Sequence, residues 1–202
     1  MKAVVVSINP KWCEKIASGE KTIEVRKTRP KIDTPFKCYI YCTQAKTIGD
    51  IILCKSEENT KLFGYNTVKG INRGFAKNED IKLKGKVIGE FVCDSMYGIS
   101  NFLPYDTDDI HHDFLPYVLE QTCLQDYEID EYLGAKDGYG WHISDLVIYD
   151  KPKSLEMFST GKIARDCGCG GYMIYDKILT RPPMSWCYVE DEEKENEQRR
   201  ND

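Results

Sequence analysis

A charge-rich stretch near the start of the chain, SGEKTIEVRK at residues 18–27, holds the side chains whose types and spacing best suit chemistry. Glu24 and Arg26 are two residues apart, so in a strand both side chains lie on the same face. Together they present a carboxylate acceptor and a planar fork of N–H donors, which suits a phosphate group or the edge of a base. Lys21 lies just before this strand, and its amine would act as a base or hold an oxyanion if it were desolvated.

The same three residues also have a structural interpretation. An internal Lys–Glu–Arg network would tie the strand to the preceding helix. On a solvent-exposed face, by contrast, the Glu24–Arg26 pair would contribute at most about 1 kcal/mol to stability. Residue types and spacing leave the network and the ligand site both open.

Two further residues are candidates for the wall of such a site. Trp141 would stack on a ligand or pack in the core, and Ser185, beside a double proline, would offer a hydrogen bond. The predicted ligand-binding set is Lys21, Glu24, Arg26, Trp141 and Ser185. Lys21 and Glu24 become candidate catalytic residues only if the protein is an enzyme.

The elements that would position these residues follow from hydrophobic periodicity and helix punctuation. Residues 9–19 are expected to form a helix, because Asn9 suits the N-cap, Pro10 the first turn and Gly19 the position after the C-terminus. Gly134 would end a second helical region. Apolar or alternating runs predict strands at residues 3–8, 21–28, 36–42, 50–54, 86–96, 138–150 and 181–190. This order predicts an α+β fold with a small, curved or closed sheet.

Two segments depart from this pattern. Residues 55–85 hold four glycines and no sustained hydrophobic period, so we expect a long loop or insertion there. Its basic residues occur with Phe63, Tyr65 and Phe75, a mixture that suits both a solvated loop and contact with RNA phosphates and unpaired bases. Residues 191–202 are expected to form a disordered acidic tail.

The charges of the chain are unevenly distributed. The net charge is −5, with +8 in residues 1–90 and −13 in residues 91–202. The first part of the chain therefore suits a surface that faces a polyanion, despite an acidic isoelectric point.

The nine cysteines are expected to be reduced, because their number is odd and most lie among apolar or aromatic neighbours. In DCGCGG, at residues 166–171, a single C-x-C pair lacks the four ligands that tetrahedral zinc requires, so we expect a glycine-rich turn carrying two thiols. We expect no metal and no cofactor. No apolar run is long enough to span a membrane and no signal-peptide core is visible, so we expect a cytoplasmic protein with no membrane partner.

Three stretches resemble the ASCH domain family: SINPKWCEKIASGEKTIEVRK at the start, GKVIGEF in the middle and GYGWHISDLVIYDKPKSLEMF later. The family hallmark G-x-K-x-x-E-x-R is met by Gly19, Lys21, Glu24 and Arg26. The resemblance implies a single domain over residues 1–190 with a PUA-like fold, a small β-barrel flanked by helices.

The resemblance also implies a cleft lined by the hallmark residues, with RNA or a modified nucleotide as partner. Some small members of the family resemble hydrolases that remove the acetyl group from N4-acetylcytidine, and ribonuclease activity is also attributed to the family. In the amidohydrolase branch a threonine stands three residues after the motif lysine, where this chain has Glu24. Binding of RNA or a nucleotide is therefore the first hypothesis, a hydrolase is the alternative, and a protein-interaction module is the third.

Overall fold

The computed structural model describes residues 2–44, 51–55, 62–68, 71–72, 81–99, 115–134 and 136–191. Within these ranges the chain has a mixed α+β fold in which strands predominate and helices are few. The predicted α+β class is therefore confirmed. In the described part of the chain, no helix has the length and apolar character needed to cross a membrane.

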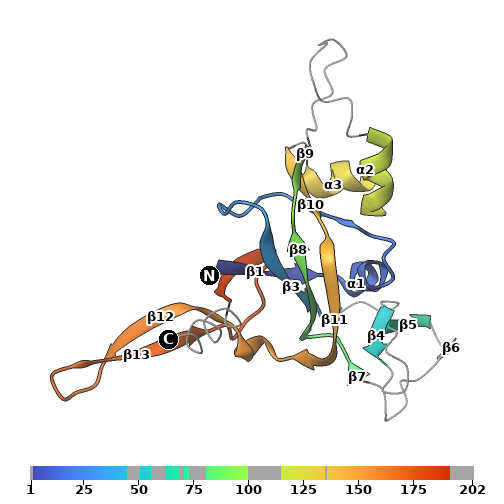
Figure 1. Cartoon of the computed structure of the whole chain (residues 1–202). Helices are drawn as coiled ribbons and strands as arrows, with labels where there is room; N and C mark the ends of the chain where they lie inside the picture. Colours follow the sequence, from blue (N-terminus) through green and yellow to red (C-terminus); the bar gives the residue numbers. More distant parts are fainter. Residues whose placement is uncertain are drawn as a thin grey trace, which may run out of the picture.

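A five-stranded sheet forms the centre of the molecule, with the strand order β11-β8-β3-β1-β14 (Figure 1). Its strands are β11 (Ser144–Lys153), β8 (Lys86–Cys93), β3 (Phe36–Cys42), β1 (Lys2–Ile8) and β14 (Trp186–Glu190). β1 and β3 are parallel, whereas the other neighbours are antiparallel. A parallel pair requires a crossover, and helix α1 (Pro10–Ala17) and strand β2 (Ile23–Arg26) lie within the connection that supplies it.

Helix α1 begins and ends where the sequence predicts. The Asn9 side chain caps its N-terminus by accepting a hydrogen bond from the Lys11 N–H at 3.0 Å, and Pro10 occupies the first turn. After the helix, Gly19 adopts a φ of 80°, a conformation that glycine tolerates without steric cost. This turn brings the chain directly to Lys21 and β2.

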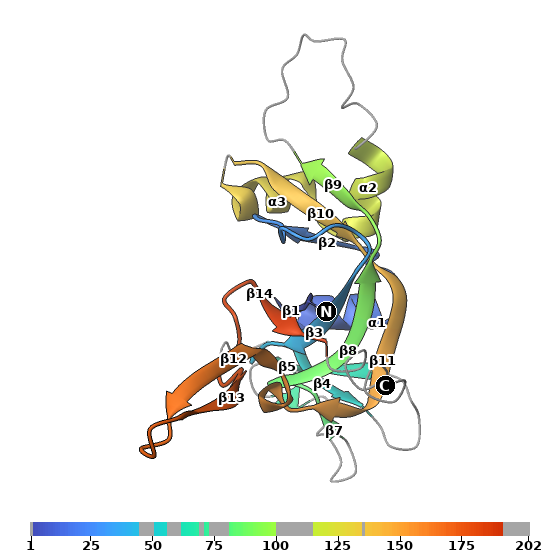
Figure 2. The same cartoon turned by 60° about the vertical axis from the view of Figure 1, so that its left-hand side comes forward.

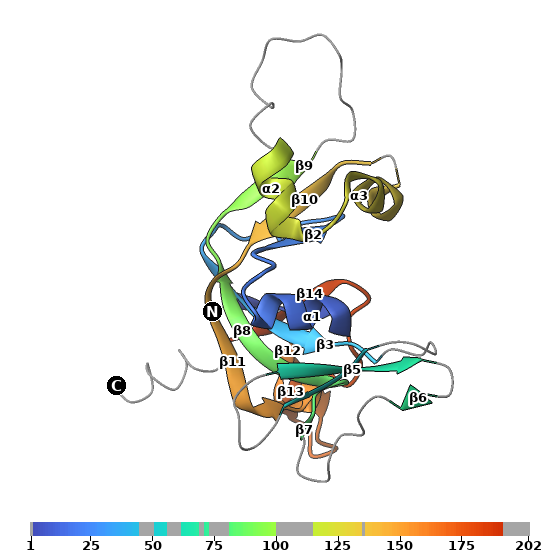
Figure 3. The ribbon, with the colours of Figure 1, turned by 90° about the vertical axis from the view of Figure 1, so that its right-hand side faces the viewer.

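A second sheet, β2-β10-β9, stands beside the first (Figure 2). It adds β10 (Gly138–His142) and β9 (Met96–Ile99), and it is covered by helices α2 (Leu115–Thr122) and α3 (Asp126–Leu133). Figure 3 shows both helices on the side of this sheet that faces away from α1. Gly134 ends α3 in the left-handed conformation with a φ of 66°, as predicted.

The chain passes between the two sheets at two points that the sequence did not reveal. The expected strand at residues 138–150 divides into β10 and β11, and the N–H of Ile143 between them donates to the Thr22 carbonyl at 2.8 Å. The expected strand at residues 86–96 is likewise divided. β8 ends at Cys93 in the central sheet, and the chain continues as β9 in the second sheet. Periodicity indicates extended chain, but the sheet that each half joins depends on partners distant in sequence.

The segment predicted to be a long loop or insertion, residues 55–85, contains strands. Strands β4 (Ile51–Lys55), β5 (Leu62–Val68), β6 (Ile71–Asn72) and β7 (Ile81–Lys82) pair in the order β6-β5-β4-β7. Most of its described residues therefore form paired strands and not a structureless loop. Phe63 and Tyr65 belong to β5, whereas Phe75 lies outside the described residues.

A β-hairpin projects from the body of the molecule (Figure 1). It consists of β12 (Ser159–Asp166) and β13 (Tyr172–Ile178), and we call it the arm. A short 3-10 helix, Leu155–Met157, precedes it. At its base the Phe158 ring packs on Tyr39, with ring centres 4.8 Å apart, and the Phe158 carbonyl accepts a hydrogen bond from the Leu179 N–H.

The largest group of buried side chains lies on one face of the central sheet and reaches Trp141 of β10. Four cysteines belong to it and act there as small apolar residues, namely Cys13, Cys38, Cys42 and Cys93. Burial raises the pKa of the Cys93 thiol to about 12. These four thiols are reduced, as the sequence predicts.

The prediction of reduced thiols is wrong for one pair, because Cys167 and Cys169 are joined by a disulfide. The surrounding DCGCGG is the expected glycine-rich turn, and Gly168 and Gly170 have φ values of 72° and 84°. Such backbone freedom lets two cysteines separated by a single residue approach each other. The spacing does not by itself show whether the sulfurs are bonded.

The sheet and the tail also differ from expectation. In the strand pairings of the described residues, β11 and β14 are the open edges of the central sheet, so the expected PUA-like barrel is not confirmed.

Asp191, the first residue of the predicted tail, is buried and accepts a hydrogen bond from the Tyr39 hydroxyl at 3.0 Å. The other tail residues, 192–202, lie outside the described part.

We expect Gly89→Ala to destabilise the central sheet. A Cβ at Gly89 would lie 2.4 Å from the Val147 carbonyl oxygen, a backbone atom of β11 that cannot rotate away. The variant should therefore lose about 2 kcal/mol of unfolding free energy in urea denaturation. Gly98→Ala in β9 is the matched control, because nothing lies within 4 Å of its added Cβ. Equal losses in the two variants would contradict the steric explanation.

Candidate functional site

Strand β2 places the candidate residues between the two sheets. All four residues of β2 are buried, because both faces of the strand are covered. Val25 packs with Ile129 and Leu133 of α3. Glu24 and Arg26, at alternate positions, therefore point the other way, toward the central sheet.

Glu24 lies between two cations. Its Oε1 atom is 2.8 Å from Arg26 Nη2, and its Oε2 atom is 3.5 Å from Lys21 Nζ. None of the three side chains is more than 7% exposed. We call Lys21, Glu24 and Arg26 the ion cluster. Charges buried this deeply are tolerated only when they are paired, so the Glu24 carboxylate is what holds both cations in place.

Lys21 is held by three different groups. Its Nζ atom donates to the Thr122 carbonyl at the end of α2, at 2.6 Å, and lies 5.1 Å from the centre of the Trp12 ring. A carbonyl at the C-terminus of a helix favours a cation. Burial nevertheless lowers the pKa of Lys21, and the neighbouring Glu24 carboxylate opposes this shift without reversing it.

Arg26 connects the second sheet to the central sheet. Its Nη2 atom donates to the Ser7 carbonyl of β1 at 2.6 Å. Its Nη1 atom makes longer contacts with Ser185, at 3.4 Å to Oγ and 3.5 Å to the carbonyl oxygen. The Ser7 N–H in turn donates to the same Ser185 carbonyl at 2.9 Å. Arg26 therefore binds where β1 meets the segment that leads into β14.

Trp141 lies opposite Glu24 in the antiparallel β10–β2 pairing, so the two side chains share a face. It is fully buried, and its ring centre is 6.0 Å from that of Phe36 and 6.0 Å from that of Trp186. Of the two interpretations that the sequence allows for Trp141, the structure therefore shows core packing.

Three buried polar atoms at this place have no hydrogen-bond partner among the described residues. They are the Oε2 atom of Glu24, the Nε atom of Arg26 and the Nε1 atom of Trp141. A buried polar group without a partner costs about 1–3 kcal/mol, so such atoms are uncommon in native proteins. The ion cluster thus combines two cations and one carboxylate with one donor, Arg26 Nε, and one acceptor, Glu24 Oε2, that lack a hydrogen bond within the described part of the chain, although Oε2 keeps its ion pair with Lys21. Trp141 beside the cluster adds a second such donor.

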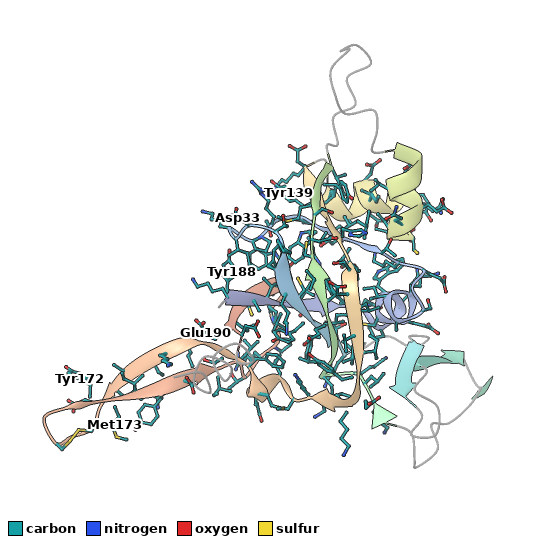
Figure 4. The ribbon with its side chains drawn as sticks, in the orientation of Figure 1. Asp33, Tyr139, Tyr172, Met173, Tyr188 and Glu190 are labelled. Carbon is teal, nitrogen blue, oxygen red and sulfur yellow. A yellow bond between two sulfur atoms is a disulfide. The ribbon has the colours of Figure 1, made fainter. Side chains whose placement is uncertain are left out.

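Cations paired with aromatic rings occur around β2. Lys11 Nζ lies 4.2 Å from the centre of the Trp12 ring, and Lys27 Nζ lies 5.2 Å from that of Tyr132. Arg29 is 5.6 Å from the ring of Tyr139, which lies opposite Arg26 in the β10–β2 pairing. Figure 4 shows Tyr139 of the second sheet and Tyr188 of the central sheet on the same side of the molecule.

The predicted site residues lie together. Lys21, Glu24 and Arg26 are in contact, Ser185 adjoins Arg26, and Trp141 faces Glu24. The arrangement is also the internal network that the sequence left as an alternative. Sequence reasoning missed the Ser7 and Thr122 carbonyls, because a backbone acceptor leaves no mark in residue identity.

We expect Glu24→Gln to destabilise the protein strongly. The amide keeps the shape of the side chain but leaves Lys21 and Arg26 as buried cations without a counter-charge, so unfolding free energy should fall by about 3 kcal/mol. Thermal denaturation measures this loss. The matched control is Glu20→Gln, whose ion pair with Lys15 at 2.8 Å is exposed and should matter little. Comparable losses in both variants would show that the ion cluster does not depend on its buried charge.

No family model matches the sequence, and no curated protein matches it. Among solved structures, the crystal structure of ASCH from Zymomonas mobilis is similar, with a TM-score of 0.52 and 14% sequence identity over 98% of this chain and 94% of that chain. Two mutants of the Zymomonas mobilis protein match with TM-scores of 0.48 and 0.49 and identities of 13% and 12%. They cover 98% of this chain, and 98% and 94% of their own chains. The chain therefore has an ASCH-like fold.

Proposed function

We propose that the protein binds RNA or a nucleotide at the ion cluster. The observation that supports this proposal is the group of unpartnered atoms, with the Arg26 Nε and Trp141 Nε1 donors beside the Glu24 Oε2 acceptor. A base edge that carries an exocyclic amine next to acceptor atoms, as in cytosine or adenine, would complement them. The excess of cations over carboxylates also favours a ligand rich in acceptors or negative charge.

The surroundings of the cluster suit a polynucleotide. The basic side chains of Lys11, Lys27 and Arg29 would contact phosphates, and the rings beside them would stack on unpaired bases. A PUA-like relationship of the fold, which the sequence resemblance implies, agrees with this role and is part of the proposal.

A ligand can reach the ion cluster only if part of its cover moves. The Ser185 contacts of Arg26 are the most easily displaced, because at 3.4 and 3.5 Å they are long for hydrogen bonds. Met184, next to Ser185, is fully exposed and makes no core contact that would hold the segment down. Displacing this segment would free Arg26 Nη1 and leave the short bonds from Arg26 to Glu24 and Ser7 in place. It would also have to break the two bonds that Ser7 makes to the segment, from its N–H to the Ser185 carbonyl at 2.9 Å and from its Oγ to the Pro183 carbonyl at 2.7 Å.

A second candidate function is hydrolysis of a modified nucleoside such as N4-acetylcytidine. The observation that favours it is the lowered pKa of Lys21, since a lysine that gives up its proton more readily can act as a general base. Glu24, 3.5 Å away, would exchange that proton with it. The short bond from Lys21 to the Thr122 carbonyl would have to break first.

Binding is tested with single-stranded RNA homopolymers of cytidine, adenosine and uridine, measured by fluorescence anisotropy. We expect the cytidine and adenosine polymers to bind more tightly than the uridine polymer, because only their bases offer an exocyclic amine beside a ring-nitrogen acceptor, whereas the single N–H donor of uracil lies between two carbonyl groups. Trp141→Phe removes one donor and keeps an aromatic ring, so it should weaken binding about tenfold. The matched control is Trp186→Phe, because the Trp186 indole already donates to Thr28 Oγ1 at 3.0 Å. No binding, or equal weakening by both variants, would contradict the proposed site.

The hydrolase is tested separately by incubation with N4-acetylcytidine. Release of acetate that is lost in Lys21→Met would establish the enzyme. Binding of RNA without release of acetate would instead leave the protein a binding module. Thermal denaturation of Lys21→Met distinguishes a lost reaction from a lost fold.

A further inference from the structure

We propose that the disulfide between Cys167 and Cys169, at the tip of the arm, is a thiol–disulfide exchange site for proteins that carry two neighbouring thiols. This activity is independent of nucleotide binding at the ion cluster, because the two sites share no residue. It rests on the position of the disulfide, its hydrogen bonds and the exposed strand beside it.

The disulfide lies in the turn between β12 and β13, at the end of the arm farthest from the body (Figure 4). Cys169 is exposed, as are Gly168 and Gly170 on either side of it, and Cys167 is half-buried. Exposed disulfides are the ones open to exchange, whereas structural disulfides are usually enclosed. A thiolate in solution can therefore reach the Cys169 sulfur.

The disulfide contributes little to holding the arm together. It joins residues only two positions apart, so the loop that it closes is among the shortest possible, and a disulfide stabilises less the shorter the loop that it closes. It also does not join β12 to β13, which already pair from Ser159 with Ile178 to Asp166 with Tyr172. A structural role therefore does not explain it.

Hydrogen bonds in the turn give the two sulfurs different roles. The Cys169 N–H donates to the Cys167 sulfur at 3.4 Å. A thiolate formed at Cys167 would keep this donor, and hydrogen bonding stabilises a leaving thiolate. The Gly168 N–H donates to Asp166 Oδ1 at 2.8 Å, and the Cys167 N–H donates to the Gly171 carbonyl at 3.1 Å. These two bonds do not involve the disulfide, so the turn would keep its shape after reduction.

The exposure of Cys169 and the hydrogen bond to the Cys167 sulfur set the order of the exchange steps. A thiolate of the client protein attacks the Cys169 sulfur, a mixed disulfide forms, and the Cys167–Cys169 bond breaks with Cys167 leaving as the thiolate. The second thiolate of the client then attacks the client sulfur of the mixed disulfide and releases Cys169. The client dithiol loses two electrons and becomes a disulfide, while Cys167 and Cys169 gain them and take up the two protons.

The strand next to the disulfide offers a surface for such a client. All seven residues of β13 are exposed, and Tyr172, Met173 and Ile174 are 77%, 51% and 70% exposed. In the described part of the chain β13 pairs only with β12, so its outer edge is open to an extended segment. An exposed apolar strand with a free edge is typical of a surface that binds another chain.

Four other thiols, which are buried in the core, are poorly suited to exchange. Burial raises the pKa of Cys13 and Cys38 well above that of a free thiol, and Cys42 and Cys93 are buried in the same core. A thiol that stays protonated is a poor nucleophile. Exchange is therefore not expected at these four thiols, and the half-buried Cys123 is tested by its own variant.

The full-length protein, purified without reductant, is mixed with a synthetic peptide that carries two cysteines separated by two residues. Alkylation of free thiols followed by peptide mass spectrometry shows which sulfurs react. We expect the peptide to become oxidised while Cys167 and Cys169 become alkylatable, with an unchanged circular dichroism spectrum. Cys169→Ser should abolish peptide oxidation, whereas Cys123→Ser, which removes a half-buried thiol elsewhere, should leave it intact.

Two further variants separate the chemistry from client binding. Cys167→Ser should trap a mixed disulfide between Cys169 and the oxidised peptide. Tyr172→Ser should slow the reaction with the peptide but not the reaction with dithiothreitol, which needs no surface to bind. Unlinked thiols at Cys167 and Cys169 in the air-oxidised protein, a peptide that stays reduced, or capture of zinc by the two sulfurs in place of exchange would each overturn the proposal.

Discussion

The buried contact between the Glu24 carboxylate and the Arg26 guanidinium is the interaction on which the rest of the arrangement depends. At 2.8 Å it joins alternate positions of β2, and the same Arg26 Nη2 atom reaches the Ser7 carbonyl of the central sheet at 2.6 Å. Glu24 also faces Lys21, which is bonded to the end of α2. One carboxylate thus links the central sheet, the second sheet and a helix. Without this carboxylate, two buried cations would repel each other. Each would also lack a counter-charge, which is strongly destabilising.

Burying these charged groups costs free energy, and this cost is relevant to the function. Apolar residues of similar volume would often hold two sheets together at least as well as buried charges do. Three polar atoms in and beside the ion cluster also lack hydrogen-bond partners among the described residues. Stability alone therefore does not explain the residue types, whereas a ligand of the proposed kind, with a donor beside acceptor atoms, would explain them. The same physical groups would serve both roles, because the carboxylate orients Arg26 through Oε1 while Oε2 has only its 3.5 Å ion pair with Lys21 and no hydrogen bond to the described residues.

The passage of the chain between sheets explains how the ion cluster comes to be covered. β8 continues into β9 and β10 continues into β11, so both connections cross from one sheet to the other beside β2. The two sheets are consequently held at one side by continuous backbone. On the Ser185 side they are joined by Arg26, through contacts that are longer than its bond to Ser7. The arm belongs to neither sheet, and its exposed disulfide and strand are free to take part in a separate interaction.

The sequence alone determined the local structure around the site. Asn9, Pro10 and Gly19 marked the limits of α1, and the alternation in IEVR placed Glu24 and Arg26 on one face and Ile23 and Val25 on the other, because these signals depend on neighbouring residues only. It also identified Lys21, Glu24, Arg26, Trp141 and Ser185 as candidates, and these residues lie together. Only the tertiary structure decided that both faces of β2 are buried, that Ser7 and Thr122 supply carbonyls, that residues 55–85 contain strands, and that Cys167 and Cys169 are bonded. Each of these depends on which distant segments meet or on the conformation of a turn. Hydrophobic periodicity carries no information about either.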